Sequence, residues 1–281
     1  RKTCTKRFLR VITVRQTLPR SVSAMARLRL GTFNLLHGLS IRTATADEAD
    51  LRSAAAALDA DVLGLQEVDR GQPRSGKTDQ AAVVADELGA TWWRFAPALS
   101  GTPLNWTPSD PGDASIGSGY GVALISRLRV LHWDLRTFPA APISLPLTIA
   151  GRRGLALVPD QPRVALAAVV VGPDGPFTVA TAHLSFVPGW NARQLRAVAR
   201  WLATMPPPRV LAGDLNLPGR VPAALTGWVD LVRAPTYPSW RPRVQWDHIL
   251  SRGVGTNDVR EATAIRLPVS DHNALVVDVV L

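Results

Sequence analysis

The sequence predicts an α/β fold built on mixed β-sheets, and three observations support this prediction. Short apolar runs alternate along the chain with helical stretches, which is typical of α/β domains. Two of these runs, 163–171 and 177–183, are separated by Gly-Pro-Asp-Gly-Pro, a turn signal that predicts an antiparallel hairpin within the alternating pattern. Apolar residues make up 46% of the 281 residues, which is enough to bury a substantial core in one large domain or two small ones.

The expected elements follow from the spacing of the apolar positions. Alternate residues of Arg27–Asn34 share one face, which predicts a strand. Residues 45–58 predict a helix that has Thr45 as its N-cap, Glu48 three residues later and an apolar stripe behind them. Loops rich in Pro, Gly and Ser are expected at 96–119 and 138–162, around the active site. The other predicted helices are 79–88 and 191–202, and the other strands are 62–66, 121–126, 163–171, 177–183, 209–213, 246–250 and 274–281.

The positive charge of the chain is concentrated at its beginning. Residues 1–30 hold nine of the 32 Lys and Arg side chains and no acid, so the remaining residues carry 23 basic against 22 acidic side chains. A nearly neutral body gives no support for nucleic-acid binding, which usually needs a basic face. Residues 1–24 lack a hydrophobic period and are expected to form a disordered basic extension, whose removal should leave folding and catalysis intact.

Two further features bear on the compartment. The single cysteine, Cys4, excludes an intramolecular disulfide and fits a reducing compartment, so a cytoplasmic protein is the expectation. The longest purely apolar runs, such as 164–171, fall well short of the ~20 residues that a transmembrane helix needs. No transmembrane segment and no obligate protein partner are therefore predicted.

Polar side chains stand at the ends of the predicted apolar strands at one position after another, and Asp271 and His272 come just before the last of these strands. Charged groups next to core strands cost free energy unless they are paired or bind a metal. If these strand ends converge at one edge, they form a pocket able to hold a hard cation, and the oxygen donors among them suit Mg²⁺ or Mn²⁺. The residues concerned are Asn34, Glu67, His183, Asp214, Asp247, Asp271 and His272.

A family resemblance joins these positions. The segments TFNLLHG, LQEVD, GVALISR, TAHLSF, AGDLN, WDHIL and SDHNALVV are similar, in order and spacing, to motifs of the endonuclease/exonuclease/phosphatase superfamily. The resemblance covers residues 27–281. It implies one catalytic domain over 25–281, folded as a four-layer sandwich of two mixed β-sheets flanked by helices. It also implies a hydrolase that uses Mg²⁺ or Mn²⁺ to cleave phosphate esters by in-line attack of water.

The resemblance also implies roles for individual residues. Asn34 and Glu67 resemble the metal-site pair, and Asp271 a further ligand of the metal or its water. Asp214 resembles the carboxylate that orients or activates the attacking water, and Asn216 the amide that holds the phosphate.

Two imidazoles complete the implied site. His272 resembles the imidazole that works with Asp247, which fixes its tautomer and stabilises its charged form. His183 resembles the second imidazole of the nuclease and sphingomyelinase branches, and it argues against the abasic-site branch. His37, Tyr120 and Arg127 are further candidates for contacts with the substrate phosphate or the pocket wall.

Structural roles remain open for each of these residues taken alone. Asn34 could cap a turn, Glu67 could be a solvated strand end, and Asp214 could form an Asx turn. A non-catalytic binding scaffold is the alternative function, although every polar position of the family pattern is filled. The expected partner is a phosphate-ester substrate. A nuclease and a lipid or small-molecule phosphodiesterase both remain possible readings.

Overall fold

A computed structural model describes residues 27–103, 105–110, 117–148 and 154–280. The expected basic extension, residues 1–24, lies outside these ranges. Within them, no helix is long and apolar enough to cross a membrane.

Most strands belong to two large mixed sheets. The first has seven strands in the order β14-β15-β1-β2-β5-β3-β4, and the second has six in the order β12-β13-β11-β10-β9-β6. The first sheet consists of β1 (Arg27–Asn34), β2 (Val62–Arg70), β3 (Trp92–Ser100), β4 (Thr107–Pro108), β5 (Gly119–Ser126), β14 (Val259–Ile265) and β15 (Ala274–Val280). The second consists of β6 (Val130–Phe138), β9 (Arg163–Gly172), β10 (Gly175–His183), β11 (Arg209–Asp214), β12 (Val229–Asp230) and β13 (Asp247–Arg252).

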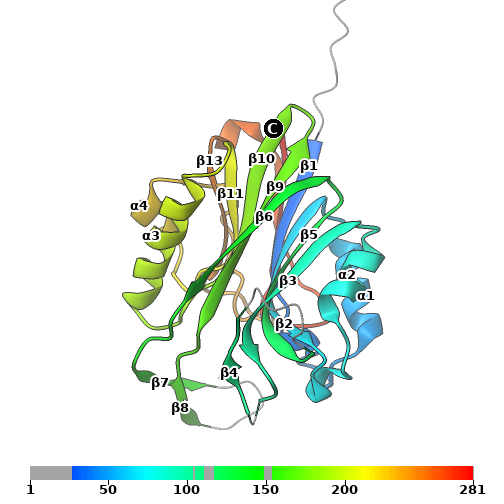
Figure 1. Cartoon of the computed structure of the whole chain (residues 1–281), viewed down its shortest axis with the longest axis vertical. Coiled ribbons are helices and arrows are strands. Elements are labelled where there is room, and N and C mark those ends of the chain that lie inside the picture. Colours follow the sequence, from blue (N-terminus) through cyan, green and yellow to red (C-terminus); the bar gives the residue numbers. More distant parts are fainter. Residues whose placement is uncertain (1–26, 104, 111–116, 149–153, 281) are drawn as a thin grey trace, which may run out of the picture.

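The helices cover the outer faces of the two sheets. Figure 1 shows α1 (Glu48–Leu58) and α2 (Gln80–Glu87) beside the seven-stranded sheet, and α3 (Trp190–Leu202) and α4 (Val221–Thr226) beside the other sheet. Three clusters of buried apolar side chains lie between these layers, one between the sheets and one under each helix pair. The predicted four-layer α/β sandwich of two mixed sheets flanked by helices is confirmed.

Two parallel strand pairs determine which strand ends meet. β1 pairs with β2, and β10 with β11, and a helix lies between the two strands of each pair in the chain. Because carboxyl ends of parallel strands lie at the same edge, the side chains that follow β1 and β10 are next to those of their partner strands. The predicted antiparallel hairpin is also present as β9–β10.

The sheets approach each other closely at Gly64 in β2. A Cβ atom at this position would lie 2.7 Å from Thr181 Oγ1 of β10 and 3.1 Å from the Ala212 carbonyl oxygen of β11. Close by, the Gln66 amide donates hydrogen bonds to Thr181 (2.8 Å) and Thr32 (3.0 Å). A glycine and a buried polar link therefore set the spacing of the sheets just before the strand ends.

Some local predictions were wrong. Helix α1 begins at Glu48 with Asp47 as N-cap, since the Asp47 carboxylate accepts hydrogen bonds from the backbone N–H groups of Ala49 and Asp50. Thr45 lies before this cap and bonds Thr43. Aspartate caps a helix at least as well as threonine does, so Asp47 is the N-cap because it lies next to the first helical turn.

The two predicted loops also contain strands. The first holds the end of β3 and all of β4. The second holds β7 (Ser144–Thr148) and β8 (Leu155–Pro159), which pair antiparallel as a separate two-stranded sheet. In Figure 1 this hairpin lies at the lower end of the molecule.

Candidate active site

The strand ends bring the predicted polar residues together from both sheets. In the six-stranded sheet, His183, Asp214 and Asp247 are neighbours across the adjacent strands β10, β11 and β13. In the other sheet, Asn34 ends β1 opposite Gln66 of β2, and Glu67 follows directly. The catalytic candidates therefore face one another across the sheet-to-sheet contact.

Glu67 occupies a β-bulge. Strand β2 carries one more residue than β5 between the pairs Leu65–Ala123 and Val68–Gly121, and Glu67 has a positive φ of 54°. A bulge turns side chains away from the regular alternation, and positive φ is unfavourable for residues other than glycine. Such strain is typical of functional sites. The predicted strand end at Gln66 is wrong, because β2 continues past the bulge to Arg70.

Asn34 links two carboxylates. Its Nδ2 donates to Glu67 Oε1 (3.1 Å) and Asp214 Oδ2 (3.0 Å), and its Oδ1 accepts from the Leu36 backbone N–H (3.0 Å). One partner is a donor and the other two are carboxylates, so the orientation of the amide is fixed by its neighbours. Asn34 thus links the two sheets. Its Oδ1 atom already accepts one hydrogen bond, so only its second lone pair remains for a metal ion.

Asp214 lies between two imidazoles. Its Oδ2 is 3.6 Å from His183 Nε2 and 4.0 Å from His272 Nε2. The other ring nitrogen of His272 lies 2.8 Å from Asp247 Oδ2. Asp247 is fully buried, so this carboxylate can orient His272 without contact with solvent.

The two imidazoles have opposite protonation preferences. Burial lowers the pKa of His183 well below its usual value, and the positive charges of Arg163 and His272 act in the same direction. Burial also lowers the pKa of His272, but the charge and hydrogen bond of Asp247, together with other nearby acids, raise it to about 10. At neutral pH, His183 is uncharged and His272 is an imidazolium.

Asp214 titrates near neutrality. Burial raises its pKa, and the charge of Asp247 adds to this rise, so the value reaches about 7 although His272 acts against it. A carboxyl group with this pKa is suited to general acid–base chemistry.

Asn216 lies just beyond β11 with a positive φ of 50°. Its backbone N–H donates to Asp214 Oδ1 (3.0 Å), which is an Asx-type turn. Its side-chain Nδ2 donates to the Leu184 carbonyl (2.9 Å). Asp214 and Asn216 therefore form the Asx turn that was one alternative for them. The same turn holds Asn216 in the pocket wall, where the functional alternative also places it.

The acids at this edge form a donor set suited to a hard cation. Burial raises the pKa of Asp271 to about 6, and the charge of Glu67 contributes to the rise, which shows that the two carboxyl groups repel each other. A divalent cation between them would remove this repulsion, and carboxylate and amide oxygens are ligands that Mg²⁺ and Mn²⁺ accept. Asp214, Asp247 and His272 also lie within 4.8 Å of one another, but the Asp247–His272 hydrogen bond occupies part of that group.

A pocket of about 520 Å³ opens over these groups, lined among others by Glu67, His183, Asp214, Asn216 and His272. The substrate-contact candidate Tyr120 also lines it. Burial and the neighbouring Glu67, through its charge and a hydrogen bond, raise the pKa of Tyr120 well above its usual value, so the phenol stays protonated.

The other two candidates for substrate contacts, Arg127 and His37, are not in the pocket wall. Arg127 follows β5, which runs antiparallel to β2, so it lies at the opposite end of the sheet. There its guanidinium bonds the Leu88 carbonyl (2.7 Å) and Asp59 (2.8 Å), and its prediction as a substrate contact is wrong. His37 lies in a turn after β1, where its carbonyl accepts a hydrogen bond from Gln80 (2.7 Å). Burial and Arg74 lower its pKa to about 3.

Comparison with known proteins agrees with this geometry. Residues 31–272 match the Endonuclease/Exonuclease/phosphatase family. The chain belongs to this family. No match was found among curated proteins.

Solved structures of this family share the fold. An endonuclease/exonuclease/phosphatase from Beutenbergia cavernae is 22% identical with a TM-score of 0.60, and the match covers 91% of this chain and 72% of that one. A mannosyl-6-phosphatase from Bacteroides thetaiotaomicron is 15% identical with a TM-score of 0.55, over 90% and 100% of the two chains. Sphingomyelinase C from Streptomyces griseocarneus is 15% identical with a TM-score of 0.57, over 90% and 99%.

Four further residues of the pocket wall were not predicted as site residues, although Phe186 and Trp246 lie within the quoted motifs TAHLSF and WDHIL. Tyr237 packs on His272 with ring centroids 5.1 Å apart, and Trp246, Phe186 and Arg163 also line the pocket. Tyr237 and Trp246 stand in an irregular segment before β13, where spacing carries no information about direction. In the sequence, only the aromatic character of that segment could have indicated that it contributes to the pocket wall.

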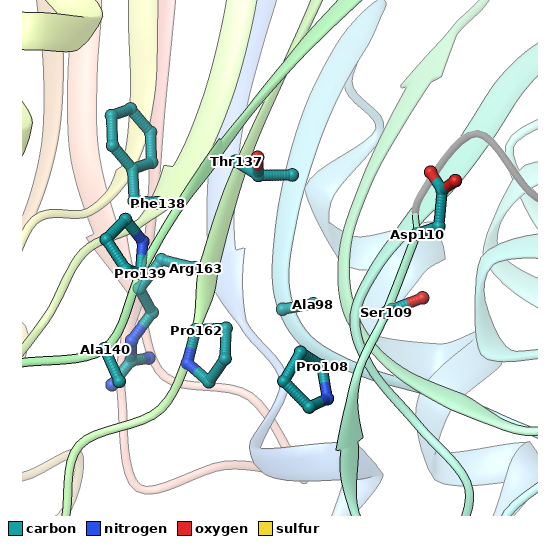
Figure 2. A pocket seen from close by; sticks show the side chains of 10 residues that line it. All are labelled: Ala98, Pro108, Ser109, Asp110, Thr137, Phe138, Pro139, Ala140, Pro162 and Arg163. Carbon is teal, nitrogen blue, oxygen red and sulfur yellow. The ribbon is translucent and has the colours of Figure 1, made fainter.

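Arg163 lines both this candidate pocket and a second pocket. The second pocket has a volume of about 670 Å³ and lies between β3–β4 and β6–β9. Figure 2 shows Ala98 and Pro108 on one side of it and Phe138 and Pro162 on the other. Its walls are mainly apolar.

Proposed function

We propose that the protein is a divalent-metal-dependent phosphodiesterase that cleaves its substrate by in-line attack of water. The observation that carries this proposal is the position of Asp214, whose carboxylate lies within 4.0 Å of two imidazoles and bonds the Asn34 amide. A base with a pKa of about 7, a charged donor and a neutral donor around one point are what hydrolysis of a phosphate ester needs.

The residues divide the chemistry among them. Asp214 accepts a proton from the attacking water, which its ionised form can do above its pKa of about 7. His272, held by Asp247, donates from Nε2 to a phosphoryl or leaving oxygen as charge develops there. His183 adds a neutral donor from the neighbouring strand.

Glu67, Asp271 and the oxygen of Asn34 are the residues that would hold the metal. When bound, a divalent cation supplies Lewis-acid stabilisation of the charge on the phosphoryl oxygens. The charge of Glu67 contributes to the raised pKa of the partly buried Asp271, and this electrostatic coupling of the two acids supports the assignment.

The net charge of the chain beyond residue 30 favours some classes of phosphate ester over others as the substrate. The body of the chain carries 23 basic against 22 acidic side chains beyond residue 30, which gives a nucleic-acid backbone little attraction. The structurally similar proteins named above include a sphingomyelinase and a sugar phosphatase, which are not nucleases by name. A lipid or small-molecule phosphodiester is therefore favoured over DNA or RNA.

Hydrolysis of bis-p-nitrophenyl phosphate tests this function. We expect turnover with Mg²⁺ or Mn²⁺, loss of turnover with EDTA and recovery on adding back the metal. p-Nitrophenyl phosphate, assayed in parallel, separates diesterase from monoesterase activity. No metal-dependent turnover of either compound, by a protein with an intact cooperative thermal transition, would favour a non-catalytic binding scaffold.

A further inference from the structure

The β7–β8 hairpin presents apolar side chains both to the pocket and to its outer side. Among its described residues there is no Asp, Glu, Lys or Arg. Leu147 and Val158 line the catalytic pocket from one face of the hairpin, and Pro159 at the end of β8 also lines it. On the opposite face Leu155 and Leu157 are 72% and 73% exposed, the largest values among the exposed large apolar residues of the described chain, and Ile143 at the root is 50% exposed.

The root of the hairpin is firmly anchored. The buried Asp160, directly after β8, accepts hydrogen bonds from the Ala141 N–H (2.7 Å), the Ser185 hydroxyl (2.8 Å) and the Arg163 guanidinium (3.2 Å). Ala141 precedes β7, and Ser185 follows the catalytic candidate His183. These bonds fix both ends of the hairpin to the edge of the active site, so the exposed leucines keep a defined position relative to it.

The strands themselves are less supported. β7 and β8 pair only with each other and join neither large sheet. A two-stranded hairpin is marginally stable in water without further packing. Exposed apolar side chains on such an element indicate that something covers them during function.

The shape and position of the hairpin favour one occupant. Three aliphatic side chains on a narrow projection present far less area than the ~800 Å² per partner of a stable protein–protein interface. A lipid surface needs no complementary shape and accepts aliphatic side chains without charge. The same hairpin lines the catalytic pocket, so whatever its outer face contacts is brought to the mouth of that pocket.

From this juxtaposition we propose that the β7–β8 hairpin docks on a lipid surface and brings the catalytic pocket to phosphate esters of amphiphiles held there. This rests on the proposed phosphodiesterase function. The phosphate group would enter the pocket over Asp214, and the apolar part of the amphiphile would remain beside the hairpin. The mainly apolar pocket of Figure 2, whose wall includes Pro139 and Ala140 before the hairpin and Pro162 after it, offers this part further apolar surface.

The test is co-sedimentation of the full chain with phosphatidylcholine vesicles. Zwitterionic lipid is chosen because the basic residues 1–30 would bind anionic vesicles whatever the hairpin does. The variant is Leu155→Ser/Leu157→Ser, which removes the exposed aliphatic groups but leaves the pocket-lining Leu147 and Val158 unchanged. The matched control is Leu131→Ser on β6, a leucine that is 49% exposed outside the hairpin.

We expect the wild type and Leu131→Ser to sediment with the vesicles, and the double variant to partition about tenfold less or weaker still. Hydrolysis of bis-p-nitrophenyl phosphate, a soluble compound, should be equal for all three proteins. If the wild type does not hydrolyse this compound, the proposed function is overturned. If all three proteins sediment equally with the vesicles, or if no protein sediments, the docking proposal alone is overturned. Light scattering that shows a wild-type dimer and a monomeric double variant also overturns it, because a second copy would then cover the hairpin.

Discussion

The Nδ1 atom of His272 lies 2.8 Å from the Oδ2 atom of the fully buried Asp247. This bond leaves Nε2 of the same ring directed to the side of Asp214, 4.0 Å away. The pair comes from a strand of one sheet and the turn before a strand of the other, so it also connects the two halves of the site.

Replacing Asp247 by Asn should remove most of the activity. The amide keeps the shape of the side chain but loses the charge that raises the pKa of His272, so the imidazolium is no longer favoured. We expect kcat for bis-p-nitrophenyl phosphate to fall by ~10²–10⁴-fold with little change in KM. Asp86→Asn, at a side chain that is 72% exposed, is the control and should leave kcat unchanged. Near-normal kcat in Asp247→Asn would remove His272 from the proposed mechanism.

The rate should rise with pH through about 7. Asp214 must be ionised to accept a proton, and its pKa of about 7 means that the active carboxylate form is gained as the pH increases. A bound cation favours the carboxylate, so it moves the midpoint downward. Asp214→Ala and His272→Ala should each lower turnover by ~10²–10⁴-fold. The check is kcat/KM against pH for the wild type, and a rate that falls across this range would contradict the role of Asp214.

Mg²⁺ or Mn²⁺ should stabilise the folded protein through Glu67 and Asp271. A ligand that binds only the native state at about 100 times its dissociation constant adds ~2.7 kcal/mol to the free energy of unfolding. The thermal midpoint should therefore rise with added metal in the wild type and stay constant in Glu67→Gln, measured by circular dichroism. An equal rise in both proteins would place the metal elsewhere.

Arg127→Ala should affect stability but not catalysis. Its guanidinium bonds the Leu88 carbonyl and Asp59 at the end of the sheet opposite the pocket. Since the side chain is about one-third exposed, we expect a loss of about 1 kcal/mol in the free energy of unfolding. Urea denaturation measures this loss, and kcat and KM should equal the wild-type values. A raised KM would restore the original assignment to substrate binding.

Arg163→Met should destabilise the protein more strongly. It leaves the buried Asp160 carboxylate without its cation, and the loss of one partner of such a pair costs about 3–5 kcal/mol. The double variant Arg163→Met/Asp160→Asn should recover part of this loss, because the remaining group is uncharged. Urea denaturation compares both variants with the wild type, and wild-type stability of Arg163→Met would show that the ion pair contributes nothing.

The fold and most of the site follow from one rule that can be read in the sequence, that apolar strands end in polar residues. The rule placed Asn34, His183 and Asp214 correctly at the ends of strands that the structure brings together, and Asp247, also predicted for the site, begins β13 opposite Asp214. It could not give strand direction, and Arg127 was misplaced because β5 runs antiparallel to β2.

Other features depend on tertiary contacts that periodicity does not record. The bulge at Glu67 depends on pairing with β5, and a local pattern shows only an apolar run followed by an acid. The β7–β8 hairpin stands in a Pro-rich segment and joins neither large sheet, and its exposed positions 155 and 157 carry leucine, so apolar and polar residues do not alternate along β8. Tyr237 reaches His272 only because an irregular segment folds over the strand ends.

Gly64 carries no chemistry, yet the reactive groups depend on it. A methyl group there would press against Thr181 and Ala212, which stand two residues before His183 and Asp214. Gly64→Ala would therefore widen the distance between opposing reactive groups while every ionisable side chain is retained. Inactive variants recovered from random mutagenesis should accordingly include substitutions deep inside the molecule. These variants would be inactive because the strands are displaced, while every reactive side chain is still present.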